Sequence, residues 1–119
     1  MKVVDKRSCR EIWWAHAKGL YMGKTLEIKD GHRLSMQYHE QKDETIYVLK
    51  GKLTLYVSGY ESHEKGTEIT LEQGEAYRVR PLTVHRFIAN HGDVTLLEVS
   101  TDYPEDVVRI SDDYGRNSD

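Results

Sequence analysis

Four residues that could ligate a metal ion stand at spacings that would let them meet. Gln37 and His39 are two positions apart, so on a β-strand their side chains point to the same face. The polar residues Glu40 to Asp43 can form a turn, which would return Glu44 on a neighbouring strand. His85 lies further along the chain and is the obvious fourth ligand. Imidazole, carboxylate and amide groups form a mixed nitrogen and oxygen set, which suits a divalent cation better than a closed structural zinc site.

The alternation of residues 33–39 has two interpretations. The apolar set is Leu34, Met36 and Tyr38, and the polar set is Arg33, Ser35, Gln37 and His39. If the apolar face packs in the core, the polar face is simply solvated. If the polar face lines a pocket, the apolar strip needs cover from another strand or from a second subunit. A second spacing, from Gly74 to His85, favours the pocket because it supplies a further ligand at the start of a later strand.

Composition limits the chain to one small domain and excludes several kinds of partner. The chain has 119 residues, a net charge of −3 and no basic run, so neither nucleic acid nor an anionic membrane is expected as a partner. No apolar stretch approaches the roughly 20 residues of a membrane span, and the first residues lack the apolar run of a signal peptide. Cys9 is the single cysteine and cannot form an internal disulfide, which predicts a cytoplasmic location. We expect Cys9 to be an idle thiol in a loose segment, and His16 receives no role.

Short runs rich in β-branched and aromatic residues, separated by turn signals, predict an all-β domain. The expected strands are Gly19 to Ile28, His32 to His39, Glu44 to Lys50, Lys52 to Ser58, Thr67 to Leu71, Ala76 to Val79, Val84 to Ala89 and Val94 to Ser100. This pattern predicts a small antiparallel barrel or sandwich. We expect the barrel to span residues 19–110, after a segment 1–18 that could add an edge strand and before a polar tail 111–119.

The residues around the first ligands resemble the first motif of the cupin family. That motif is a glycine, five residues, His-x-His, three or four residues, a glutamate, six residues and a glycine. Gly31, His39, Glu44 and Gly51 match its spacing, and Gln37 stands in the place of the first histidine. The resemblance implies a jelly-roll barrel with one divalent metal ion, for which Zn, Mn, Fe, Ni and Co stay open.

The second cupin motif is matched in part. Gly74 and His85 have its spacing, whereas Arg80 and Leu82 replace its proline and glycine and Asn90 falls one residue late. These departures concern the geometry of the turn and leave the ligand in place.

A narrower resemblance is to the cupin domain of the type II phosphomannose isomerases. Residues 34–39 are similar to their Leu-Ser-Leu-Gln-x-His, and residues 84–86 to their x-His-Arg. Residues 105–110 and 112–116 resemble their closing Glu-Asp-x-Val-Arg and Asp-x-Tyr-Gly-Arg. The resemblance implies a metal-dependent isomerase that interconverts mannose 6-phosphate and fructose 6-phosphate through an enediolate.

A sugar phosphate needs cationic partners in its pocket. We expect substrate contacts from Arg33, Arg80, Arg86 and Tyr47, although a solvated role competes for each arginine and a packing role for the tyrosine. Arg109 and Arg116 lie in the family-like tail. The residue that transfers the proton is not assigned.

Two other functions stay open beside the isomerase. The chain could be a non-catalytic module that binds a metal and a sugar, or another cupin enzyme, such as an oxygenase or one acting on a nucleotide sugar. We also expect a two-fold homodimer, because the strip Leu34, Met36 and Tyr38 needs cover. A second strip, Leu53, Leu55 and Val57, is expected to fill the barrel interior.

Overall fold

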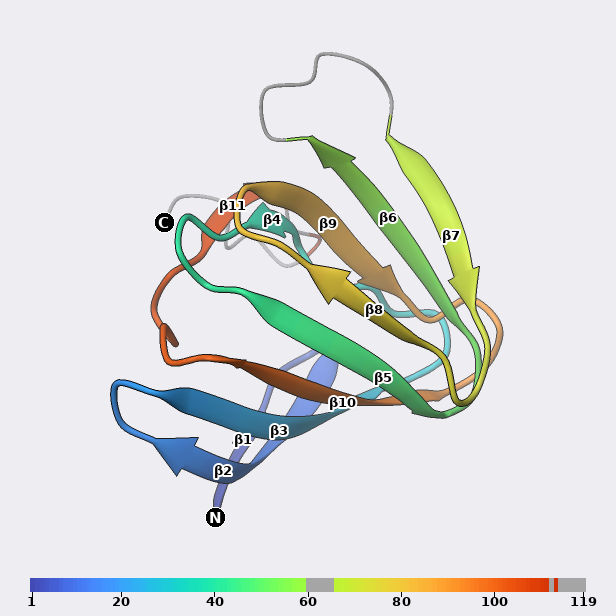
Figure 1. The fold of residues 1–119 in the computed structure, drawn as a ribbon. Coiled ribbons are helices and arrows are strands. Elements are labelled where there is room, and N and C mark those ends of the chain that lie inside the picture. The colour runs from blue at the N-terminus through green and yellow to red at the C-terminus, as the bar shows by residue number, and fades with distance from the viewer. Residues whose placement is uncertain (60–65, 112, 114–119) are drawn as a thin grey trace.

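The computed structural model describes residues 1–59, 66–111 and 113, and within them the regular structure is entirely β-strand (Figure 1). Six strands form one antiparallel sheet in the order β1-β2-β3-β10-β5-β8, and five form a second in the order β11-β4-β9-β6-β7. The all-β prediction is confirmed. The strands are β1 (Lys2–Asp5), β2 (Cys9–Ala17), β3 (Tyr21–Ile28), β4 (Met36–Tyr38), β5 (Glu44–Lys50), β6 (Leu53–Gly59), β7 (Thr67–Leu71), β8 (Ala76–Val79), β9 (Thr83–Ile88), β10 (Val94–Thr101) and β11 (Val108–Ser111).

The two sheets enclose one hydrophobic core. Ile46 and Val48 of β5 point into it from the six-stranded sheet, and they alternate with residues that are partly or fully exposed. Leu53 and Leu55 enter from β6 and are completely buried, and Val57 packs against the same cluster, which confirms the predicted interior strip. Each fully buried Leu, Ile or Val contributes about 1.5–3 kcal/mol of transfer free energy.

Strand β4 is shorter than the alternating pattern predicted. It contains three residues, and Arg33 makes only an isolated bridge to β9. The intervening Leu34 and Ser35 are not in a strand, so the side-chain alternation does not continue through them. The prediction that Leu34 shares an outer strip with Met36 and Tyr38 is therefore wrong, because Leu34 packs against the core.

The predicted N-terminal segment 1–18 holds a hairpin rather than a loose chain. Strand β2 pairs with β3 along its length, and β1 forms the edge of the six-stranded sheet. Cys9 is buried at the start of β2, and burial raises the pKa of its thiol to about 12. The thiol is therefore protonated at neutral pH, as expected of an idle cysteine, although its surroundings are not loose.

Gly51 of the first motif has a structural role in the turn between β5 and β6. Its φ angle is 86°, and a Cβ atom at this position would collide with the carbonyl oxygen of Asp93. Within the described residues, no helix has the length and apolarity to cross a membrane. Most of the predicted tail 111–119 lies outside the described residues, which include only Ser111 and Asp113 of it.

Candidate metal centre

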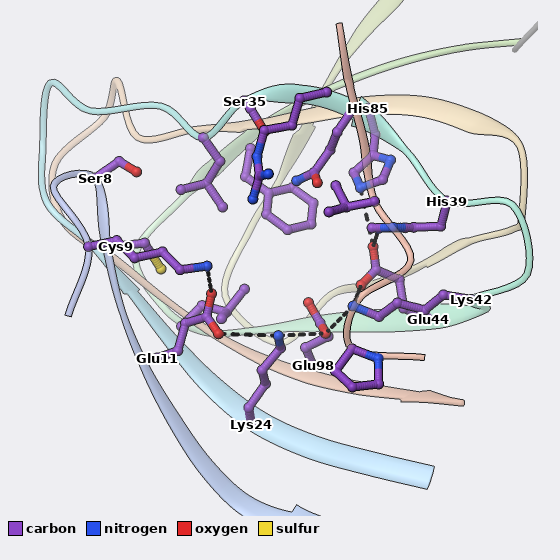
Figure 2. A pocket seen from close by; sticks show the side chains of 18 residues that line it. Ser8, Cys9, Glu11, Lys24, Ser35, His39, Lys42, Glu44, His85 and Glu98 are labelled. Carbon is purple, nitrogen blue, oxygen red and sulfur yellow. Dashed lines mark hydrogen bonds and ion pairs between the residues drawn. The ribbon is translucent and has the colours of Figure 1, made fainter. Parts of the chain in front are cut away.

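Side chains from both sheets line a pocket of about 660 Å³, a volume that includes its open mouth (Figure 2). Strands β2, β3, β5 and β10 contribute side chains from one sheet, and β4, β9 and β11 contribute side chains from the other.

Three of the four predicted ligands converge at one end of this pocket. Oε1 of Glu44 lies 3.4 Å from Nε2 of His39 and 3.2 Å from Nε2 of His85. His39 follows β4, Glu44 begins β5 and His85 lies on β9, so three separate segments supply them. All three side chains are nearly fully buried, and one ligand atom from each lies within 4.8 Å of the others.

Asp106 organises the turn that carries the chain from His39 to Glu44. Its carboxylate accepts hydrogen bonds from the backbone N–H groups of Glu40, Gln41 and Lys42, at 3.0, 2.7 and 2.8 Å. Burial would raise the pKa of Asp106, but these hydrogen bonds lower it overall. The carboxylate therefore stays ionised and fixes the spacing between the two ligands.

Backbone carbonyl groups set the orientation of both imidazole rings. Nδ1 of His85 lies 2.9 Å from the carbonyl oxygen of Thr83, and Nδ1 of His39 contacts the carbonyl oxygen of Asp106. A carbonyl oxygen only accepts, so each Nδ1 carries the hydrogen and each neutral ring presents the Nε2 lone pair. Two lone pairs and a carboxylate oxygen then face one point.

This convergence leaves buried acceptors without donors. Among the described residues, neither Nε2 of His85 nor Oε1 of Glu44 has a hydrogen-bond partner. Their 3.2 Å contact brings two acceptors together and is not a hydrogen bond in this tautomer. Unpaired buried acceptors are costly, and a cation between them removes the cost. The donor set therefore fits a divalent metal ion.

Lys42 binds the other oxygen of Glu44. Its Nζ lies 3.4 Å from Oε2 of Glu44 and 3.1 Å from Oε2 of Glu98. Burial acts to raise the pKa of Glu44, but Lys42, together with the neighbouring His39 and His85, outweighs it, and the pKa falls well below its ordinary value. Glu44 is thus ionised, with Oε1 left to face the imidazoles.

Comparison with known proteins agrees with this arrangement. The family model for the cupin domain matches residues 24–100. The chain belongs to the cupin family. No curated protein matches the sequence significantly.

Solved cupin-fold structures overlay most of the chain. The structure of KdgF from Halomonas sp. has a TM-score of 0.74 at 18% identity, over 88% of this chain and 89% of that one. The capsular polysaccharide assembling protein CapF from Staphylococcus aureus has a TM-score of 0.78 at 11% identity, over 86% of this chain. Oxalate decarboxylase from Lactobacillus farciminis, in a formate complex, has a TM-score of 0.76 at 14% identity, over 92% of this chain. This chain spans only 28% and 33% of the latter two, and these identities establish the fold alone.

The fourth predicted ligand of this cupin lies on the same pocket wall. Gln37 is half-buried on β4, and in the sheet it is the direct cross-strand partner of His85. On its other side it pairs with Arg109 of β11. All three line the pocket, so Gln37 stays a candidate ligand and Arg109 is a neighbouring cation that the predicted substrate contacts did not include.

The four predicted substrate contacts are not among the residues that line the pocket. Tyr47 lies between two inward-pointing residues of β5 and is therefore exposed on the outer face. Arg86 lies between two pocket residues of β9, and its Nε donates to the carbonyl oxygen of Leu34 at 2.6 Å. Strand alternation directs both side chains away from the site.

The remaining two arginines lie where the regular strands are interrupted. Arg33 is exposed and binds Asp113 through Nε and Nη2, at 2.7 and 2.9 Å. It does not share the face of Gln37 because β4 does not extend back to it. Arg80 is exposed in the turn after β8.

Sequence reasoning missed a row of charges along the pocket wall, which is buried except for Lys6 at its end (Figure 2). From Lys42 the row continues through Glu98 to Lys24, whose Nζ lies 3.6 Å from Oε2 of Glu98. Nζ of Lys24 is also 3.3 Å from Oε1 of Glu11, and Oε2 of Glu11 is 2.8 Å from Nζ of Lys6. Burial acts to raise the pKa of Glu11, but these lysines and Trp13 lower it to about 2.

A signal for this row was present in the strands. Lys24 alternates with Met22, Leu26 and Ile28, all of which point inward on β3. Glu98 has the same position among the inward residues of β10. A charge at an inward position of an apolar strand has to be compensated, which marks it as part of a polar site.

Proposed function

We propose that this cupin is a metal-dependent sugar-phosphate isomerase, which interconverts an aldose and a ketose of the mannose 6-phosphate and fructose 6-phosphate type. The observation that carries the proposal is the convergence of three buried acceptors, Nε2 of His39, Nε2 of His85 and Oε1 of Glu44. The resemblance of residues 34–39 and 105–110 to the phosphomannose isomerases directs the choice among cupin activities.

His39, Glu44, His85 and Gln37 would hold one divalent ion, with Zn, Mn, Fe, Ni and Co all compatible with nitrogen and oxygen ligands. Such an ion would supply Lewis-acid polarisation of a carbonyl oxygen and the adjacent hydroxyl oxygen. The carbonyl hydrogen bonds at both Nδ1 atoms keep the Nε2 lone pairs available.

The reaction moves one proton between adjacent carbons and needs no oxidant or reductant. The proton on C2 of the aldose leaves to a base, the C1 oxygen gains a proton, and an enediol forms. Return of a proton to C1, with loss of the proton from the C2 oxygen, gives the ketose. The protein's task is to hold the two oxygens in place and to keep bulk water from the enediolate.

The charges of the pocket favour an anionic substrate. Among the described lining residues, four cationic side chains face three carboxylates, and a bound divalent ion adds two further positive charges. Arg109 is the strongest candidate for the phosphate group, since it lines the pocket two strands from His85, about 10 Å away at ordinary strand spacing.

A metal-reconstitution assay tests this function. The protein is stripped with a chelator, reloaded separately with each of the five ions, and assayed with mannose 6-phosphate through a coupled enzyme. We expect turnover that depends on at least one ion. Protein that binds an ion stoichiometrically but converts neither mannose 6-phosphate nor fructose 6-phosphate would contradict the proposal. Oxygen consumption, or turnover only of a nucleotide sugar, would assign a different cupin activity.

The expected homodimer stays part of the proposal, but through the outer face of the six-stranded sheet instead of the strip Leu34, Met36 and Tyr38, because Leu34 packs against the core. That face exposes Trp14, Tyr21, Tyr47, Leu49 and Val99, which gives a second copy an apolar surface to cover. Gel filtration at micromolar concentration is expected to show a dimer, and a monomer would contradict this part. The cytoplasmic location stays a prediction.

A further inference from the structure

The row of charges links the candidate metal centre to the N-terminal hairpin. It alternates ammonium and carboxylate groups, from Lys42 through Glu98, Lys24 and Glu11 to Lys6. Lys24 and Glu98 are direct cross-strand partners on β3 and β10, so the sheet itself sets their spacing.

Ser8 lies beside the far end of this row. The residue is 2% exposed, and within the described residues its Oγ has no hydrogen-bond partner. The residue lines the same pocket as the metal ligands, on the opposite side of the view in Figure 2. A buried hydroxyl without a partner costs free energy, and a bound ligand would remove that cost.

The chemistry of the row selects a class of ligand group. A hydroxyl group both donates and accepts, so a series of hydroxyls can accept from Lys24 and donate to Glu11 and Glu98. A phosphate or carboxylate would meet a negative charge at every second position, and both carboxylates are buried, which strengthens the repulsion. The wall therefore matches a polyhydroxylated chain better than an anion.

We propose that this wall binds successive hydroxyl groups of a polyhydroxylated substrate, and that Ser8 and Glu11 hold the hydroxyl farthest from the metal centre. The identity of that substrate as a sugar phosphate rests on the proposed function. The phosphate itself is then held away from the wall, on the side of Arg109. Ser8 and Glu11 both precede residue 24, so the hairpin adds this subsite outside the matched cupin domain.

Calorimetry with metal-loaded protein tests the inference. The probes are mannose 6-phosphate, mannose, and glycerol 3-phosphate, which keeps the phosphate but has few hydroxyl groups. We expect Ser8→Ala and Glu11→Gln to weaken binding of both hexoses by about five- to thirty-fold. Any affinity for glycerol 3-phosphate, and the affinity for the metal, should stay within about twofold of wild type.

Asp5→Asn provides the matched control, because Asp5 is exposed in the same hairpin and does not line this pocket. It should leave every affinity unchanged, and circular dichroism checks that each variant folds. Hexose affinities within twofold of wild type in both Ser8→Ala and Glu11→Gln would overturn the inference, as would wild-type protein that binds neither hexose. If Ser8→Ala weakens hexose binding but the protein shows no isomerase turnover, the subsite is supported and the proposed function is rejected.

Discussion

The two ends of the pocket are built from opposite kinds of unsatisfied group. At the metal end, His85 and Glu44 present buried acceptors that face one another. At the hairpin end, Glu11 accepts three hydrogen bonds, from two lysines and an indole, and the group without a partner is the hydroxyl of Ser8. A cation satisfies the first end and a hydroxyl satisfies the second. Under the proposed function, this contrast assigns chemistry to one end and substrate recognition to the other.

The largest expected effect follows from removing a metal ligand. His85→Ala should abolish stoichiometric metal binding and lower isomerase turnover by at least about a thousandfold, because Nε2 of this residue is one of the converging acceptors. Elemental analysis and the coupled assay measure both effects. His91→Ala is the control, since His91 is exposed in a turn. If His85→Ala kept its metal, the metal end would have been misassigned.

The next effect is on acid stability at the hairpin end. The pKa of Glu11 is lowered from 4.5 to about 2, so its stabilisation is complete above pH 4.5 and is lost as the pH falls from 4.5 toward 2. A shift of this size corresponds to at most about 3 kcal/mol. Urea unfolding of wild type and Glu11→Gln should give a difference in unfolding free energy that shrinks over this range. A difference independent of pH would contradict the assigned network.

A smaller effect is expected from Arg109, which pairs with Gln37 across the sheet. Arg109→Gln should weaken binding of mannose 6-phosphate by about ten- to a hundredfold, because it removes a charge-assisted contact to the phosphate. Binding of unphosphorylated mannose should not change. Arg80→Gln is the matched control, since Arg80 is exposed outside the pocket. An equal loss of affinity for both sugars would show that Arg109 does not bind the phosphate group.

The smallest effect concerns the thiol at the hairpin end. Burial raises the pKa of Cys9 to about 12, so at pH 8 the folded protein should react with a thiol reagent far more slowly than the unfolded chain. Cys9→Ala should keep turnover within about twofold of wild type. Rapid labelling, or loss of turnover in this variant, would indicate a reactive group at the hairpin end and contradict the assignment of chemistry to the metal end.

The metal end could be predicted because its information is local. The spacing of Gln37, His39 and Glu44 crosses a single turn, and His85 lies near the start of β9, the strand that pairs with β4. The cupin resemblance covered the same residues, and the family match confirms it. One reversal of the chain brings His39 and Glu44 together, and the cupin motif supplied His85, which reaches them through the pairing of β4 with β9.

The other residues of the pocket could not all be placed from the sequence, because their positions depend on contacts between distant strands or on interruptions of a strand. Arg33 was placed in the pocket because the alternation of β4 was extended through a segment that is not a strand. Tyr47 could have been excluded, since its neighbours Ile46 and Val48 are apolar and must point inward. Glu11 could not be placed, because its partner Lys24 lies on another strand and each charge alone looks solvated.

A crystal structure of the metal-loaded protein, with anomalous diffraction at the absorption edge of the metal, tests the central claim most directly. We expect one anomalous peak, with bonds to Nε2 of His39, Nε2 of His85 and Oε1 of Glu44, and with both Nδ1 atoms still donating to carbonyl groups. No peak at this position in stoichiometrically loaded protein, or ligation through Nδ1, would contradict the account.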